Sequence, residues 1–317
     1  MVSRLLDEIK SHGDRGAVVS YYRINDLKWN MLELKNGEFH IEWINRMVNH
    51  ITNDDNRFIP SGINFELQSI ITIIIPNPKV LLEFRYKGKP IPCTLPSHYS
   101  NWYSKNEQAL NYLQVFLSYY GYSVAMAITL PQKMLAVHSG LALYGRNNIC
   151  YSPEFGSHMQ IMSYLSDLPC AEDIWFPIKR MEACEKCNAC VTSCPTDAIN
   201  KNQHIINSDK CITRVNEVPE NYPDGFPEWI GKKAHNSIMG CSVCQDCCPC
   251  NDHNKMNEII GVKFTEEETM EILCNKGNIS YSNSVSAKLI TLGMLPEYTK
   301  PLALSRNLTA FLNKQEL

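Results

Sequence analysis

The sequence predicts an α+β fold made of three parts. Residues 1–178 mix strand-like and helix-like segments, residues 179–255 are rich in cysteine, and residues 256–317 have the pattern of short helices. With 317 residues and 44% hydrophobic content, the chain can bury a substantial core and divide into more than one packed unit. We therefore expect a mixed α/β core, an inserted cysteine module and a small C-terminal helical cap.

The first part contains five segments with the pattern of β-strands. Each is short and rich in β-branched or aromatic residues, and most are bounded by proline or glycine turns. The expected strands are residues 70–75, 80–86, 122–130, 147–151 and 158–165. The stretch from Pro92 to Tyr99 is too rich in proline and polar residues to predict a strand, so we expect a loop there.

Helical spacing of apolar residues predicts two helices in the first part and three in the tail. Proline at the start and glycine at the end mark the second one. The tail begins with a capping-box pattern at Thr265, in which a Glu follows the capping residue three positions later. The expected helices are residues 106–120, 131–145, 265–277, 284–292 and 302–312.

The middle part carries two cysteine runs with ferredoxin-like spacing. The first run reads C-x-x-C-x-x-C-x-x-x-C-P, in which three thiolates hold one [4Fe–4S] cube and the fourth reaches a second cube. In the second run an insertion separates Cys211 from the C-x-x-C-x-x-x-C-P that begins at Cys241. The predicted ligand sets are Cys184, Cys187, Cys190 and Cys248 for one cube, and Cys194, Cys211, Cys241 and Cys244 for the other.

Zinc and disulfides are the alternatives to this assignment. Zinc sites pair C-x-x-C knuckles and do not explain two separate Cys-Pro steps. Disulfides need an oxidising compartment, whereas residues 1–24 carry no secretory core and no twin-arginine signal, so we expect a cytoplasmic location. One ligand stays open, because Cys247 and Cys250 flank Cys248 and only the following proline favours Cys248.

Charge and hydropathy bear on the partners. The formal net charge is −3, which does not favour a nucleic-acid partner, although a local basic groove is compatible with it. The longest apolar run, residues 70–75, ends at Pro76 and is far too short to cross a bilayer. We expect no membrane partner.

Several motifs between Leu130 and Asn251 resemble one family. They are the glycine-rich stretch 139–148, Pro-Glu-Phe-Gly at 153–156 and Phe-Pro-Glu-Trp-Ile-Gly at 226–231. Together with the cysteines, this pattern is similar to the corrinoid iron–sulfur reductases that include epoxyqueuosine reductase and the reductive dehalogenases. The resemblance implies a nitroreductase-like α+β core, a docked two-cluster ferredoxin-like module and base-off cobalamin between them.

The resemblance also implies which residues approach the corrin ring. Glycine permits close backbone approach, and the arginine and asparagines could bond the carboxamide or phosphate edge. The alternative is structural, with a helix C-cap, a surface charge and a turn. The expected cofactor-binding residues are Gly140, Tyr144, Gly145, Arg146, Asn147, Asn148, Phe155 and Gly156.

One departure from the family concerns the proton donor. Epoxyqueuosine reductases carry an Asp-Thr-x-Pro phrase, whereas this chain has Ile128 at the position of the aspartate. The nearest groups in sequence that could donate a proton are His98 and Tyr99, in the expected loop before residue 100. We predict that one of them is catalytic and lies on the substrate side of the corrin.

These observations predict a cobalamin-dependent iron–sulfur oxidoreductase that reduces a small organic substrate. A ferredoxin or flavodoxin would supply the electrons to the clusters. Two alternatives stay open: an electron-transfer or activator protein for another corrinoid protein, and an epoxyqueuosine reductase acting on tRNA. The missing acid and the apparently shorter helical tail argue against the tRNA substrate.

Overall fold

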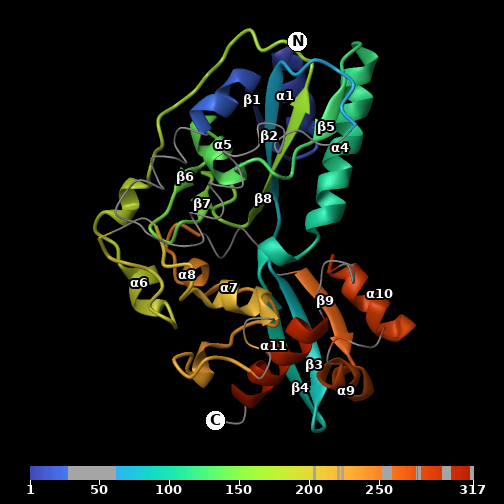
Figure 1. The fold of residues 1–317 in the computed structure, drawn as a ribbon, viewed down its shortest axis with the longest axis vertical. Helices are drawn as coiled ribbons and strands as arrows, with labels where there is room; N and C mark the ends of the chain where they lie inside the picture. The colour runs from blue at the N-terminus through green and yellow to red at the C-terminus, as the bar shows by residue number, and fades with distance from the viewer. Residues whose placement is uncertain are drawn as a thin grey trace. The chain divides into compact units, whose positions relative to one another are not determined.

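The chain has a mixed α/β fold, seen in a computed structural model (Figure 1). It forms two compact units, and each unit is built from three separate segments of the chain. The first unit comprises residues 1–76, 104–154 and 159–184, and the second comprises 77–103, 155–158 and 185–317. The described residues are 1–27, 62–202, 205–219, 222, 225–251, 259–275, 277, 280–294 and 301–314. The three-part division at residues 178 and 255 stays a prediction.

A four-stranded antiparallel sheet forms the centre of the first unit, in the order β1-β2-β8-β5. Its strands are β1 (Arg15–Ser20), β2 (Ser69–Pro76), β8 (Met159–Ser166) and β5 (Val124–Met126). The apolar run of β2 is buried because strands flank it on both sides and helices pack on it. The helices of this unit are α1 (Val2–Ser11), most of α4 (Trp102–Tyr119) and α5 (Gln132–His138).

The first unit matches most of its predicted elements. The strands at 70–75 and 158–165 and the helix at 106–120 are confirmed as β2, β8 and α4. The strand at 122–130 shrinks to β5, and that at 147–151 becomes β7 (Cys150–Tyr151), which pairs with β6 (Leu143–Tyr144). The helix that follows Pro131 ends at His138 because Gly140 adopts a left-handed φ of 81°.

The second unit contains a three-stranded sheet in the order β4-β3-β9. Strand β3 (Val80–Tyr86) runs antiparallel to β4 (Lys89–Leu95) and parallel to β9 (Ile259–Phe264). One apolar core joins this sheet to three helices. They are α9 (Glu266–Cys274), α10 (Asn283–Thr291) and α11 (Pro301–Lys314). The predicted capping box is present at the start of α9.

The expected loop at 92–99 is partly wrong. Residues 89–95 form β4, even though Pro90 and Pro92 lie inside it. Strand β4 is an edge strand that pairs only with β3 among the described residues, and an edge strand tolerates proline because the missing N–H groups need no partner on the open side. The following residues form the short turn η2 (Ser97–Tyr99).

Short helices carry the cysteine segments of the second unit. They are α6 (Ala189–Ser193), α7 (Ile212–Glu217) and α8 (Val243–Asp246), and α6 packs on α8. Cys184 ends the 3-10 turn η3 (Glu182–Cys184). Among the described residues, no helix is both long enough and apolar enough to cross a membrane.

Candidate functional site

The structure brings together three of the four cysteines predicted for the second cube. The thiol of Cys241 interacts electrostatically with those of Cys211 and Cys194, and Cys211 interacts with Cys194. Burial is the larger effect: it raises the pKa of Cys241 to about 11 and also raises that of Cys211. Three partly buried thiols gathered in one place suit a site at which iron binds them as thiolates.

Hydrogen-bond donors surround these sulfur atoms. The Ala198 N–H lies 3.3 Å from Cys194 Sγ, and Asn236 Nδ2 lies 3.1 Å from Cys241 Sγ. Backbone N–H groups after Cys211, at Thr213 and Arg214, lower the pKa of its thiol against the effect of burial. Donors of this kind stabilise thiolates and tune the potential of a cluster. The residues at this site therefore fit an iron–sulfur cluster.

The first ligand set is less completely defined. Because α6 packs on α8, the segment that holds Cys190 lies against the segment that holds Cys244. Cys247 interacts with Ser193 at the end of α6 and with the neighbouring Cys248. The choice among the cysteines at 247, 248 and 250 stays a prediction. In the described part of the chain, no group of three or more His, Cys, Asp or Glu is arranged to hold a single metal ion.

The predicted cofactor glycines let the backbone meet the chain's own side chains. A Cβ on Gly140 would lie 2.8 Å from Phe176 Cε2, and one on Gly145 would lie 2.7 Å from Tyr151 Cε2. Gly156, whose φ is 57°, would place a Cβ against Asn251 Oδ1. These glycines are required for internal packing, whatever they do for a cofactor.

The polar residues beside these glycines also have partners within the first unit. Arg146 is buried and donates from Nη2 to the carbonyl oxygen of Cys184. Asn147 donates to the Tyr151 hydroxyl at 2.9 Å, and Asn148 Oδ1 accepts from Lys133 at 2.7 Å.

Tyr144 in β6 pairs with Cys150 in β7. Burial is the main cause of the raised pKa of Tyr144. Its backbone N–H donates to the Lys179 carbonyl at 3.0 Å. The glycine-rich stretch is thus tied to the segment that leads to the first cluster cysteine, and its role as a corrin site stays a prediction.

The Phe155–Gly156 motif belongs to the second unit. The next residue, Ser157, donates from its backbone N–H to Asn251 Oδ1 at 2.9 Å and from its hydroxyl to Gln245 Oε1 at 2.8 Å. Ser157 and Asn251 are both buried. This motif therefore anchors the end of the second cysteine run.

The two predicted proton donors occupy different environments on η2. The His98 side chain is exposed. Tyr99 donates its hydroxyl hydrogen to Glu217 Oε1, and its ring covers Gly240, the residue before Cys241. Burial, then the charge of Glu217 and its hydrogen bond, hold the pKa of Tyr99 well above its usual value. Tyr99 therefore lies beside the second cluster segment, and a catalytic role for either residue stays a prediction.

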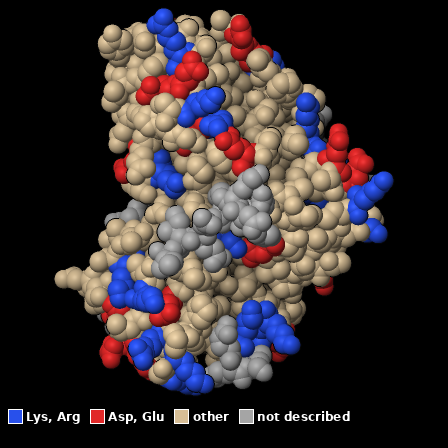
Figure 2. Space-filling view, turned by 180° about the vertical axis from the view of Figure 1, so that it is seen from behind, with Lys and Arg blue, Asp and Glu red and all other residues tan. Residues whose placement is uncertain are grey.

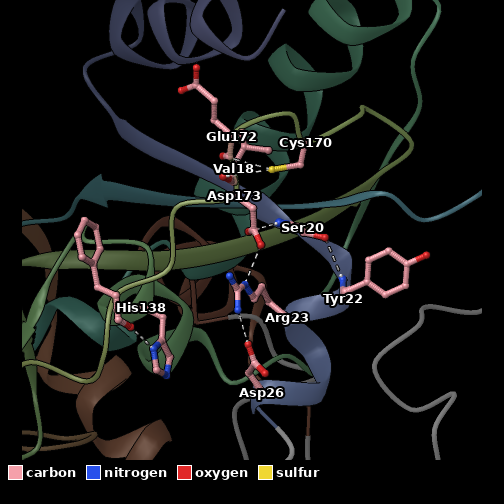
Figure 3. Close-up of polar contacts among 10 residues, drawn as sticks. Val18, Ser20, Tyr22, Arg23, Asp26, His138, Cys170, Glu172 and Asp173 are labelled. Carbon is pink, nitrogen blue, oxygen red and sulfur yellow. Dashed lines mark hydrogen bonds and ion pairs between the residues drawn. The ribbon is translucent and has the colours of Figure 1, made fainter.

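Figure 3 shows polar contacts of the first unit that involve the buried His138 and the partly exposed Arg23. His138 Nδ1 lies 2.6 Å from the Phe176 carbonyl oxygen, and its ring stacks on Trp175 at 4.2 Å between centroids. Burial lowers the pKa of His138. Nearby, Arg23 bridges Asp26 at 2.7 Å and Asp173 at 2.8 Å, so these contacts fasten the segment after β8 to the start of the chain.

Sequence reasoning missed four polar residues that organise the second cluster segment: the buried Asn216, Arg306 and Asn307, and the partly buried Asn236. The only signal in the sequence is that Arg306 and Asn307 interrupt an otherwise apolar face of the last helix. Such residues are usually assigned to the solvent face when only a sequence is at hand.

The cysteine segment matches a known domain family. Residues 183–251 match the 4Fe-4S double cluster binding domain. Curated relatives are epoxyqueuosine reductases: that of Cyclobacterium marinum is 34% identical over 125 residues, 39% of this chain and 38% of the relative. That of Bacillus subtilis is 31% identical over 123 residues, 38% of this chain and 29% of the relative. The matched segment thus spans roughly a third of the length of these relatives.

Solved structures share the fold over nearly the whole chain. A selenomethionine-labelled epoxyqueuosine reductase aligns with a TM-score of 0.64 at 19% identity, covering 98% of this chain and 81% of that one. An epoxyqueuosine reductase solved with an epoxyqueuosine-modified tRNA stem loop aligns with a TM-score of 0.62 at 18% identity, covering 99% and 82%. At this identity the likeness shows the fold alone.

The comparisons correct two expectations. A small organic substrate is the wrong choice, because the curated relatives are epoxyqueuosine reductases. The expectation against nucleic acid is also wrong, because a relative in fold was solved with a tRNA stem loop. The net charge is an average over the whole chain, so it does not report how charges are distributed on particular surfaces. On the face in Figure 2, Lys and Arg lie interspersed with Asp and Glu.

The oxidoreductase prediction agrees with the names of the relatives, all of them reductases. The family resemblance proposed from the sequence is confirmed by the cluster domain and by these relatives. Residues 183–251 thus form a 4Fe-4S double cluster binding domain, and the chain is similar to epoxyqueuosine reductases in part of its sequence and in its fold.

Proposed function

We propose that this chain is an oxidoreductase of the epoxyqueuosine reductase type, acting on a modified base within tRNA. The observation that carries the proposal is identity above 30% over more than 120 residues with reductases of that name. The cluster domain at residues 183–251 supplies the electron carriers that such a reduction needs.

The number of electrons that the reaction consumes supports two clusters in one chain. Reducing an epoxide to an alkene consumes two electrons and two protons and releases the epoxide oxygen as water. Each [4Fe–4S] cube transfers one electron at a time, so two cubes can store the pair. The external donor would be a ferredoxin or flavodoxin, and the chain's role is to hold both cubes at low potential in a protected setting.

The chain's own groups perform that role at the second cube. The N–H groups of Ala198 and Asn236 point to thiolate sulfur atoms, where they stabilise negative charge. Ala198, Ile212 and Ile238 are buried beside the cysteine segments, and this apolar packing limits the access of water to the partly buried sulfur atoms. A lower local dielectric strengthens each of these electrostatic contacts.

Cobalamin is a further part of the proposal that rests on the family resemblance. When bound, it would supply a strongly reducing metal centre. In this structure the spaces beside Gly140, Gly145 and Gly156 are filled by Phe176, Tyr151 and Asn251, so these glycines do not form an open corrin surface. The steps proposed for this chain therefore do not involve cobalamin. The same resemblance proposes a nitroreductase-like core for the first unit.

The proton would come from a group other than the family aspartate. Ile128 replaces that residue, is 57% exposed and has no proton to give. Tyr99 already donates to Glu217, whereas His98 is exposed to solvent. We propose His98 as the donor, and His98→Gln should lower turnover by about two to four orders of magnitude while both clusters remain.

An anaerobic turnover assay tests the function. The full chain, with reconstituted clusters and added cobalamin, is mixed with a chemical reductant and tRNA that carries epoxyqueuosine. The nucleoside should lose the mass of one oxygen atom, and a Cys187→Ala variant should lose the activity. Unchanged epoxyqueuosine with both clusters intact would refute the proposal and point to an electron-transfer role.

A further inference from the structure

The C-terminal helix α11 carries an arginine and an asparagine into the core of the second unit. Arg306 is 8% exposed and Asn307 is 1% exposed. Apart from Ser305, their buried neighbours on the helix are apolar, among them Leu304, Leu308 and Phe311. Burying an arginine and an asparagine is costly unless their donors are bonded, so their partners show what they stabilise.

The amide group of Asn307 joins the two separate segments of the second cluster. Its Nδ2 donates to the Asn216 carbonyl oxygen at 3.2 Å and to the Ile238 carbonyl oxygen at 2.9 Å. Asn216 lies in the last turn of α7, the helix that begins directly after Cys211. Ile238 lies in the turn that leads to Cys241. One side chain therefore spans the approaches to both cysteines.

Arg306 holds this arrangement from the side of α7. Its Nη2 donates to the carbonyl oxygens of Val215 at 2.7 Å and Asn216 at 3.2 Å, which the helix end leaves without intrahelical partners. The same nitrogen lies 3.2 Å from Asn307 Oδ1, so the guanidinium also fixes the orientation of the amide. Arg306 Cζ lies over the Phe226 ring, 4.4 Å from its centroid.

Two further contacts hold the residue before Cys241. Asn216 Nδ2 donates to the Gly240 carbonyl oxygen at 2.9 Å. The Tyr99 ring covers Gly240, whose φ of 68° and lack of a Cβ permit the contact. The Cys241 segment is thus fixed to α7, and both are fixed to α11.

We propose that Asn307 is a positioning residue for the second iron–sulfur cluster and that Arg306 holds the amide of Asn307 in place. Together they set the separation of Cys211 and Cys241, which makes the C-terminal helix part of the electron-transfer machinery. This inference rests on the proposed cluster ligands. It goes beyond them by assigning a residue far along the chain from any cysteine in the site.

The test compares Asn307→Asp with Ser305→Ala in the full, anaerobically reconstituted chain. Aspartate keeps the shape of asparagine but turns both donors into an acceptor that faces two carbonyl groups. Ser305 is a matched control, because it is buried on the same helix and donates to the Leu273 carbonyl at 2.6 Å, in α9 and away from the cysteine segments.

The readouts are iron content, the midpoint potential of each cluster and the rate of iron release to a chelator. Asn307→Asp should shift the potential of one cluster only and release its iron at least about tenfold faster, because both buried hydrogen bonds donated by the amide are lost. Ser305→Ala should change thermal stability but neither potential. Arg306→Lys, which keeps the charge and loses the fork of donors, should release that iron at an intermediate rate.

The outcomes separate this inference from the cluster assignment. Wild-type potentials and release rates in folded Asn307→Asp, with about eight iron atoms in the wild-type chain, would overturn the inference alone. If Asn307→Asp does not fold, wild-type behaviour of Arg306→Lys would overturn it. A wild-type chain that saturates at about four iron atoms would overturn the inference and the assignment together.

Discussion

The two cluster segments of this chain are built in opposite ways. Three predicted ligands of the first cluster lie within one short run, from Cys184 to Cys190, whose spacing alone predicts them. The second predicted set gathers Cys194, Cys211 and Cys241 from three places in the sequence, and polar side chains from distant elements bond to the segments around them. Local spacing defines the first site, whereas tertiary packing defines the second.

The largest expected effect is the loss of a whole cluster. Cys211→Ala should lower the iron content of the anaerobically reconstituted chain from about eight atoms to about four, because the second cube loses a ligand. Iron and acid-labile sulfide analysis measures the change. Cys274→Ala, which removes an exposed thiol from α9, is the control and should retain about eight. Equal losses of iron in the Cys211→Ala and Cys274→Ala variants would show that Cys211 is not a specific ligand of one cube.

Removal of the Tyr99 hydroxyl should weaken the packing that defines the second site. Tyr99→Phe removes the part-buried hydrogen bond that the Glu217 carboxylate accepts and should lower the free energy of unfolding by about 2 kcal/mol. Anaerobic urea titration of both proteins measures the difference. Tyr22→Phe changes a residue that is 80% exposed and should have little effect, so comparable losses would argue against the part-buried pair.

A glycine substitution tests the packing of the glycine-rich stretch in the first unit. Gly145→Ala places a methyl group 2.7 Å from Tyr151 and should cost about 2 kcal/mol even without cobalamin. Gly231→Ala adds its methyl group to open space and is the matched control. Thermal unfolding of the cobalamin-free proteins tests the packing: a fully stable Gly145→Ala would show that the close contact with Tyr151 does not require glycine at this position.

The smallest expected effect is a dependence on pH near the second site. Burial, then the charges of Arg306 and Lys314, lowers the pKa of His235 to about 4, against about 6.5 in the unfolded chain. Between pH 6.5 and pH 4 the unfolded chain therefore binds a proton at His235 that the folded chain does not bind. The contribution of neutral His235 to the free energy of unfolding is fully present above pH 6.5 and decreases as the pH falls towards 4. After allowance for solvent screening the loss is roughly 1 kcal/mol between pH 6.5 and 5.

This pH effect is measured by urea titration of wild-type protein and His235→Gln at both pH values. The wild-type protein should lose more stability on acidification than the variant does. An identical pH dependence in the two proteins would show that His235 is not the group responsible.

The sequence predicts the parts of the molecule that depend on local pattern. Strand β2 follows from an unbroken apolar run, and the start of α9 follows from the Thr265 capping box. Strand β4 could not be predicted, because its tolerance of Pro90 and Pro92 depends on its place at the edge of a sheet.

The same division holds at the site. The predicted cysteine ligands follow from their spacing, and the match to the double cluster domain supports the presence of two clusters. The roles of Arg306 and Asn307 depend on carbonyl groups roughly 70 to 90 residues earlier in the chain, and no local pattern reports such contacts. The substrate was mispredicted from the replaced aspartate, the tail and the net charge, which describe single positions or the whole chain, whereas recognition depends on particular surfaces.

The crossover of Cys194 is the central claim, and iron analysis of a double variant tests it most directly. If Cys194 and Cys211 bind the same cube, Cys194→Ala combined with Cys211→Ala removes one cube only. The double variant should then retain about four iron atoms, as each single variant does. If Cys194 instead binds the cube of Cys184, Cys187 and Cys190, the double variant loses both cubes, and iron content near zero would contradict the account.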